Sequence, residues 1–128
     1  MKMKTTYLFT IIMLIVISFK SYCQTDNTFF GDNSGINNTG NSSSGFGKNA
    51  LQNNRGNSNV AFGMGTLKSS SGGFNCAFGN EALSLNRVGN LNVAIGTRAL
   101  LNNDSGSRNI AIGHRTLERN SSGSNNTA

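Results

Sequence analysis

Residues 92–100 read NVAIGTRAL, and close variants of this phrase occur as NVAFGMGTL at 59–67, NCAFGNEAL at 75–83 and NIAIGHRTL at 109–117. These copies begin 16 or 17 residues apart, and two less regular copies precede them in phase, at residues 27–35 and 43–51. A short unit held at a fixed period over most of a chain indicates a repeat architecture, in which each unit stacks on the next. The phrase therefore determines the predicted fold.

Two sets of glycines keep this period, in a chain that has 16 glycines and no proline. We expect the glycine inside each phrase to permit a sharp turn or a positive φ. The extra residue of the 17-residue copies falls in the polar segment between the leucine and the second glycine, where a surface turn accommodates it. The first set is Gly31, Gly47, Gly63, Gly79, Gly96 and Gly113, and the second is Gly40, Gly56, Gly72, Gly89, Gly106 and Gly123.

The phrase itself predicts a short β-strand. A helix is excluded because glycine recurs every seven to ten residues, at a cost of about 1 kcal/mol each in a helix interior. In a strand, Val60 and Phe62 share one face, while Asn59 and Ala61 share the other. A strand of this length needs pairing partners, and identical strands at a fixed period stack most simply in parallel. We therefore expect an all-β fold, a parallel β-roll or β-solenoid of about six coils.

The bulky face of the strand is expected to fill the interior of each coil, and the leucine that follows is expected to close it. Cys76 takes the valine position and is interpreted as a small buried hydrophobe. The predicted core is Val60, Phe62, Leu67, Cys76, Phe78, Leu83, Val93, Ile95, Leu100, Ile110, Ile112 and Leu117, with turn glycines at Gly47, Gly63, Gly79, Gly96 and Gly113.

The other strand face carries a column of small residues, namely Ala61, Ala77, Ala94 and Ala111. The predicted core is thin for the backbone entropy that folding must overcome. We interpret the alanine column as a chain–chain interface that supplies further burial. In the alternative interpretation, alanine is merely tolerated at a solvent-facing position.

The first 23 residues have the pattern of a signal peptide. Lys2 and Lys4 precede an uncharged apolar run from Tyr7 to Phe19, which is short for a membrane span. Small residues then permit cleavage before Gln24, and the alternative is a lipoprotein acylated at Cys23. Cleavage lowers the formal net charge from +6 to +3 because three lysines are removed. One cysteine then remains, so no disulfide framework within the chain is expected.

The repeats resemble the head repeats of trimeric autotransporter adhesins, the YadA-like family, in the matching segments 59–63, 75–79, 92–96 and 109–113. The resemblance implies a parallel β-roll, three copies of which pack side by side into a surface head for attachment to matrix, glycan or cells. The chain is thus expected to comprise a signal peptide (1–23), a degenerate first coil (24–41) and repeats (42–128) that the resemblance identifies as head repeats. Because residues 126–128 begin another copy, we expect the array to continue.

Other chemistry is poorly supported by the sequence. Residues 45–50 match the dinucleotide fingerprint GxGxxA only because Gly47 is in phase with the repeat. His114 is the sole histidine, and the five acidic residues do not share a repeat position, so we expect no enzyme, metal or cofactor. Few aromatic residues are available to stack bases, which disfavours nucleic acid. Arg98, Arg108, Arg115 and Arg119 form a solvated basic face or contact a polyanion or glycan.

Three hypotheses for function remain. The first is a non-enzymatic, exported module of a trimeric adhesin-like fibre, which binds through avidity across chains. Its membrane attachment would come from parts that this chain does not contain. The second is a purely structural fibre segment, like those that carry a trimerising chaperone domain. The third is a monomeric β-solenoid that binds a regular surface such as a polysaccharide.

Overall fold

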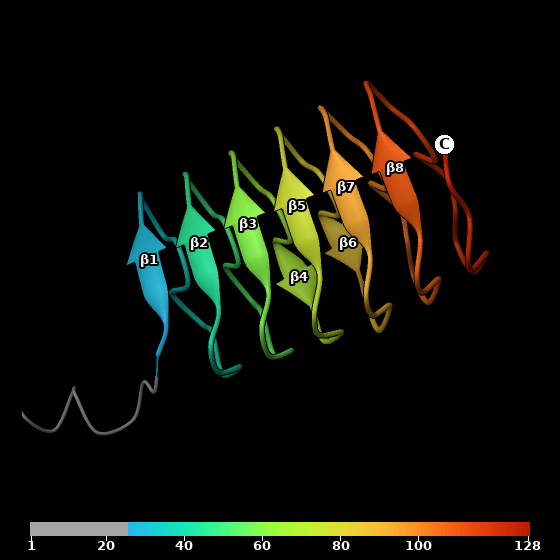
Figure 1. Cartoon of the computed structure of the whole chain (residues 1–128). Helices are drawn as coiled ribbons and strands as arrows, with labels where there is room; N and C mark the ends of the chain where they lie inside the picture. Colours follow the sequence, from blue (N-terminus) through green and yellow to red (C-terminus); the bar gives the residue numbers. More distant parts are fainter. Residues whose placement is uncertain (1–25) are drawn as a thin grey trace, which may run out of the picture.

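The computed structural model describes residues 26–128, and the predicted signal peptide, with Cys23, lies outside the described residues. The chain is an all-β parallel solenoid, and residues 26–128 contain no helix. Figure 1 shows the coils stacked in a row, with six strands side by side on one wall. These strands form sheet A and are β1 (Thr28–Phe30), β2 (Ser44–Phe46), β3 (Val60–Phe62), β5 (Cys76–Phe78), β7 (Val93–Ile95) and β8 (Ile110–Ile112).

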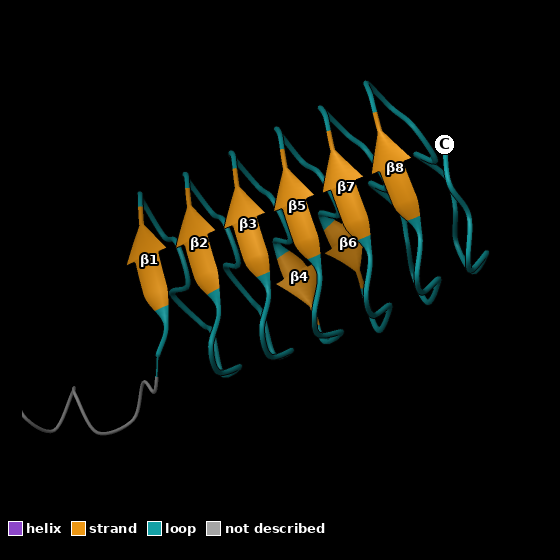
Figure 2. Cartoon of the chain, in the orientation of Figure 1, coloured by secondary structure: helices purple, strands orange, loops and turns teal. Residues whose placement is uncertain are grey.

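A second, shorter sheet lies on the opposite wall. It pairs β4 (Ser69–Ser70) with β6 (Leu85–Asn86), also in parallel. Turns and loops make up the rest of each coil, as Figure 2 shows. All pairings join equivalent repeat positions, for example Ala77 with Ala94. The predicted parallel stacking of one copy per coil is therefore confirmed.

The two faces of sheet A point the opposite way from our prediction. The four alanines predicted at a chain–chain interface, Ala61, Ala77, Ala94 and Ala111, are 0% exposed and form part of the coil interior. The residues predicted to fill the interior lie on the outside instead. Phe62, Phe78, Ile95, Ile110 and Ile112 are exposed, while Val60, Cys76 and Val93 are half-buried. Both face assignments were wrong.

The narrowness of the coil explains this reversal. One fully buried leucine per coil, at Leu51, Leu67, Leu83 and Leu100, already occupies the space between the walls, and only alanine fits beside it. Leu117 is partly buried against the same core. The leucine part of the core prediction is therefore confirmed, whereas a phenylalanine beside each leucine would overfill a close-packed interior.

Buried asparagines share the interior with the alanines. The side chain of Asn92 accepts a bond from the backbone amide of Asn109 and donates to the carbonyl of Gly106, at 2.9 and 3.0 Å. Equivalent bonds join Asn59, Asn75 and Asn92 into a ladder along the solenoid. Because a buried amide is costly only when it lacks hydrogen-bond partners, the ladder lets the asparagine face turn inward.

A second polar ladder runs along the opposite wall. Asn103 donates to Asn86 at 2.8 Å and Asn120 donates to Asn103 at 3.0 Å, while Ser70 takes the equivalent place in an earlier coil. Both ladders also donate to carbonyls of the second glycine set, as Asn75 and Asn86 do to Gly89. In each of these coils, one glycine carbonyl therefore accepts a hydrogen bond from both ladders, which links the two walls.

The glycine positions are required by close contact between neighbouring coils. Gly96 has φ 129°, and a Cβ there would lie 2.7 Å from the backbone carbon of Gly113. The predicted positive φ holds for the whole set, Gly47, Gly63, Gly79, Gly96 and Gly113, at 129–133°. The leucines also lie in the left-handed region, with φ 50° at Leu100. The tight turn thus aims each leucine side chain into the core at some cost in backbone strain.

The first coil keeps the same interior volume with different residues. Phe29 takes the alanine position and packs against the core. Glycines stand at both neighbouring places, Gly35 for the leucine and Gly45 for the next alanine, and the Phe29 ring occupies the space that a side chain at position 35 would need. The degenerate first copy is therefore a rearranged coil, with one large ring replacing a leucine.

The extra residue of the 17-residue coils lies in the predicted segment, between the leucine and the second glycine. Asn54 donates to the carbonyl two residues ahead, Gly56, but Asn86 donates three residues ahead, to Gly89. The added residue falls between Asn86 and Gly89, in a turn formed by the exposed Arg87 and Val88. Coils of different length therefore stack without disturbing either sheet.

Candidate functional site

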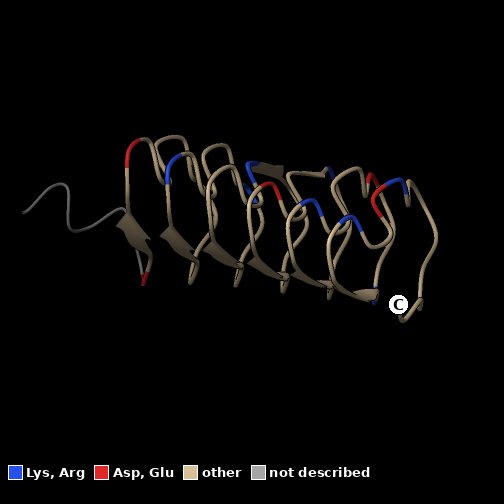
Figure 3. Ribbon diagram, turned by 90° about the horizontal axis from the view of Figure 1, so that it is seen from above, with Lys and Arg blue, Asp and Glu red and all other residues tan. Residues whose placement is uncertain are grey.

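The solenoid presents two contrasting long surfaces. The outer face of sheet A is apolar, whereas Figure 3 shows Lys, Arg, Asp and Glu gathered mainly along the opposite wall. The outward positions of the six strands of sheet A carry no charged side chain. This separation of apolar and charged residues gives each wall its own binding chemistry.

We define the apolar face as the outward side chains of sheet A. Its exposed aliphatic and aromatic surface is continuous along the coils, with Phe62 at 38% and Ile112 at 60% exposure. Contiguous exposed apolar surface of this kind is typical of interaction sites. The face comprises Phe30, Phe46, Phe62, Phe78, Ile95 and Ile112 in one column and Val60, Cys76, Val93 and Ile110 in the next.

The phenylalanines of the apolar face are ordered by stacking. The rings of Phe46 and Phe62 lie 4.6 Å apart, those of Phe62 and Phe78 lie 4.9 Å apart, and both pairs are nearly parallel. Stacked pairs at this spacing contribute beyond their buried area. The stack orders the outer surface of three successive coils.

Cys76 lies in the valine column of this face. Its thiol is free, half-buried and among neighbours that offer no positive charge on the same face. Burial raises the pKa of the Cys76 thiol, which keeps it protonated at neutral pH and a poor nucleophile. The interpretation as a small hydrophobe agrees with this setting, although the residue points outward.

Two strained apolar residues extend the same face at its edge. Phe74 and Leu91 occupy one turn position in adjacent coils, with φ 59° and 58°, and are 63% and 50% exposed. Ser58 and Arg108 stand at the equivalent place in the coils on either side. Bulky apolar side chains are unfavourable in this backbone region, and exposure gives them no compensating burial within the chain. Both side chains therefore add apolar surface that this chain leaves open.

The charged wall contains a hollow that we call the polar notch. It encloses about 390 Å³ and is lined by Asn53, Arg55, Ser69, Ser70, Ser71, Leu85, Arg87 and Asp104. Its floor is low because the third coil carries three serines in succession, while larger side chains rise from the coils before and after it. The notch thus combines hydroxyls, one exposed leucine and two arginines.

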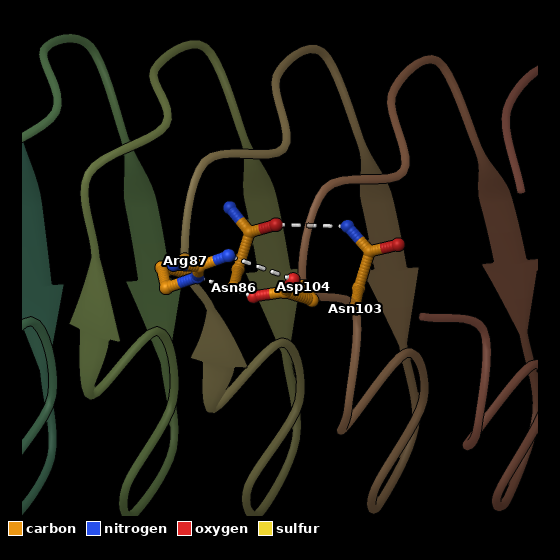
Figure 4. A network of polar contacts seen from close by, with 4 residues as sticks. All are labelled: Asn86, Arg87, Asn103 and Asp104. Atoms are coloured by element: carbon orange, nitrogen blue, oxygen red, sulfur yellow. Dashed lines mark hydrogen bonds and ion pairs between the residues drawn. The ribbon is translucent and has the colours of Figure 1, made fainter. Parts of the chain in front are cut away.

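An ion pair holds one rim of the notch. Arg87 donates through Nε and Nη2 to the two carboxylate oxygens of Asp104, at 2.6 and 3.0 Å, and the pair links neighbouring coils (Figure 4). The hydrogen bond from Arg87 lowers the pKa of the Asp104 carboxyl. Asn86 and Asn103 lie next to the pair and join the same two coils (Figure 4). The Arg87 side chain is therefore oriented, although Arg87 and Asp104 are both open to water.

A second group of ion pairs crosses the last three coils. Arg98 Nε lies 3.2 Å from Glu118 Oε1 and 3.6 Å from Glu81 Oε2, and Arg115 Nε lies 2.7 Å from Glu118 Oε2. The hydrogen bond from Arg115 lowers the pKa of Glu118. Two of the four arginines in the predicted basic face are thus occupied by acids. Within residues 26–128, no ion pair involves Arg55, Arg108 or Arg119.

Residues 26–128 contain no cluster of three or more His, Cys, Asp or Glu side chains suited to a metal ion. His114 is exposed in a turn. Over the same residues, the search for a helix long and apolar enough to cross a bilayer found none. No protein-family model matches the chain, and neither a curated protein nor a solved structure matches it.

The structure brings the predicted site residues together in a new arrangement. The predicted core side chains Phe62, Phe78 and Ile95 meet on the outer surface, and the predicted interface alanines meet inside the coil. Sequence reasoning missed Phe74, Leu91 and the polar notch. The first two carried a visible signal, since they are bulky where other copies have serine, arginine or asparagine.

Proposed function

We propose that this chain is a non-enzymatic, exported attachment module that assembles as a homotrimer through the apolar face. The observation that carries the proposal is the uninterrupted, charge-free outer surface of sheet A, with its stacked phenylalanines and exposed isoleucines. The resemblance of the repeats to YadA-like head repeats supports three copies per assembly. Export rests on the signal-peptide pattern of residues 1–23.

The periodicity of the face favours a second copy of this chain as its partner. Its side chains form ridges that repeat once per coil, about every 4.8 Å. A partner that fills the grooves between ridges over several coils needs the same spacing, and another copy of this chain has it. In a closed assembly with rotational symmetry, equivalent coils meet at the same height.

Attachment is assigned to the charged wall, which such an assembly leaves open to water. Three parallel copies present every surface group of this wall three times. A weak contact to each group then gives strong attachment overall, because the later contacts form at high effective concentration. No pocket for chemistry is needed for this role.

Oligomeric state tests the assembly. Sedimentation equilibrium of residues 24–128 is expected to give a trimer, and Phe78→Glu is expected to give a monomer that keeps its β-sheet circular dichroism. Met64→Glu introduces the same charge at an exposed position outside the apolar face and should leave the trimer intact. A wild-type monomer would overturn the proposed assembly and favour the monomeric solenoid.

Cys76 provides an independent readout in the unmodified protein. In the trimer its thiol is expected to react with a maleimide much more slowly than in the Phe78→Glu monomer. Equal rates in both would place the contact elsewhere. Attachment itself is tested by coating beads with the protein and measuring adhesion to matrix and glycan surfaces. A trimer that adheres to none of these surfaces would favour the purely structural fibre segment.

A further inference from the structure

We propose that the polar notch binds an acidic saccharide, meaning a sugar unit that carries a carboxylate or a sulfate. The inference rests on the attachment role proposed above and names its ligand class. It does not depend on the apolar face, because one chain supplies every residue that lines the notch.

The shape of the notch fits a sugar ring. The serines of the third coil leave a low floor between the second and fourth coils, which lie about 10 Å apart at twice the coil spacing. The hollow of about 390 Å³ is open on one side, so a ring within a longer polymer can enter without a free end. A pyranose chair is compact enough to enter a trough of about this width between coils.

The groups lining the notch match the two kinds of surface that a sugar offers. Ser69, Ser71 and Asn53 supply hydroxyl and amide groups that both donate to and accept from sugar hydroxyls. Leu85 is 52% exposed at one side and can cover the apolar C–H face of the ring. The lining therefore mixes apolar area with hydroxyl, amide and guanidinium groups, whereas the strands of sheet A present no charged group on the other wall.

The charges of the notch select an anion. Asp104 is the one acidic side chain in the lining, and it is held by Arg87 in a bidentate pair. The guanidinium of Arg55, on the opposite rim, has no acidic partner within residues 26–128. One unpaired guanidinium therefore remains, and it binds carboxylate or sulfate oxygens through strong charge-assisted hydrogen bonds.

The test measures binding of the full chain to three immobilised polysaccharides. Hyaluronan presents carboxylates, heparin presents sulfates as well, and dextran is neutral. We expect binding to at least one acidic polymer and none to dextran, and the two acidic arms show which anion is preferred. Equal binding to dextran, or no binding to either acidic polymer, would overturn the inference.

Two variants with matched controls locate the site. Arg55→Gln is expected to weaken binding about tenfold, because it removes the one free charge-assisted contact. Arg108→Gln removes the same charge elsewhere on the surface and should change binding less than about twofold. Equal losses in the two variants would indicate diffuse charge attraction and would contradict a site in the notch.

Ser71→Leu fills the floor without changing the charge and should abolish binding. Ser105→Leu makes the same substitution at the equivalent exposed turn outside the notch and should leave binding unchanged. Circular dichroism and thermal unfolding confirm that each variant is folded. Failure of saccharide binding with an intact trimer and intact adhesion of coated beads would reject the notch while leaving the proposed function standing.

Discussion

The inner and outer layers of sheet A are made by the same three-residue strands, yet they differ in almost every physical property. The inner layer consists of alanine, and a buried asparagine lies just before each of β3, β5, β7 and β8, where hydrogen bonds between coils hold it. The outer layer consists of valine, isoleucine and phenylalanine, partly exposed and held only by contact along the columns. In sheet A the small side chains are therefore buried and the large ones exposed, because the two walls of the coil lie close together.

The two layers therefore have different structural roles. The inner layer holds one coil together and leaves no room for variation in size. The outer layer adds little burial within the chain, and in the assembly proposed above its large side chains would be covered by a second copy. Substitutions in the two layers should therefore have different consequences.

Removing inner volume is expected to have the largest effect. Leu100→Ala should lower the free energy of unfolding by about 2–5 kcal/mol, since it leaves a cavity in a dry, close-packed interior. The loss should be the same at all protein concentrations in urea unfolding. Ile95→Ala, in the outer layer of the same coil, should instead act mainly through assembly and depend on protein concentration. Equal, concentration-independent losses would erase the distinction between layers.

Adding inner volume is expected to be the next most damaging change. Ala94→Leu should destabilise the chain by about 1–3 kcal/mol, because its neighbours Ala77 and Ala111 and the buried leucines cannot move apart. Val93→Leu, one residue earlier and in the outer layer, serves as the control and should be nearly neutral in the isolated chain. Thermal and urea unfolding measure both. A neutral Ala94→Leu would mean that the inner layer has spare room.

Relieving strain at the edge of the outer layer should stabilise the single chain slightly. Leu91→Asn replaces a leucine at φ 58° with a residue that tolerates this conformation, and we expect a gain of about 0.5–1 kcal/mol. The same substitution should weaken assembly by removing apolar contact area. Sedimentation and urea unfolding together separate the two effects. A loss of chain stability would show that Leu91 is held by its own coil.

The smallest expected effect concerns acid stability on the charged wall. The hydrogen bond from Arg87 lowers the pKa of Asp104 in the folded chain below its ordinary value of 3.8. This contribution is present above that value and disappears as the pH falls through the lower, folded-state pKa. Asp104→Asn should therefore reduce the loss of stability between about pH 4 and pH 2. Urea midpoints measured across this range provide the test.

Arg87→Gln offers the matched control, since it breaks the same pair from the other side. It should remove the same part of the acid dependence, and the double variant should add nothing further. An undiminished acid loss in both variants would assign it to other carboxyls, of which Glu118, paired with Arg115, is the next candidate.

The period, the short strands, their parallel stacking, the positive φ of the turn glycines and the place of the seventeenth residue were all predictable from the sequence. These follow from local chemistry and from repetition, both of which are visible in one dimension. The burial of Leu67, Leu83 and Leu100 was also predictable, because leucine recurs at the same position of each regular copy and a large apolar side chain is needed inside each coil.

Which face of the strand is inside depends on how the coil packs in three dimensions. Alternation defines two faces and does not orient them, and the usual preference for burying large apolar residues pointed the wrong way. The distance between the walls overruled that preference, since Ala94 fits beside Leu100 and a phenylalanine does not. The asparagine ladder offsets the cost of burying the asparagine face, because Asn75 and Asn92 find hydrogen-bond partners in the neighbouring coils once these are stacked. The polar notch likewise exists only after serines of one coil lie between larger side chains of its neighbours.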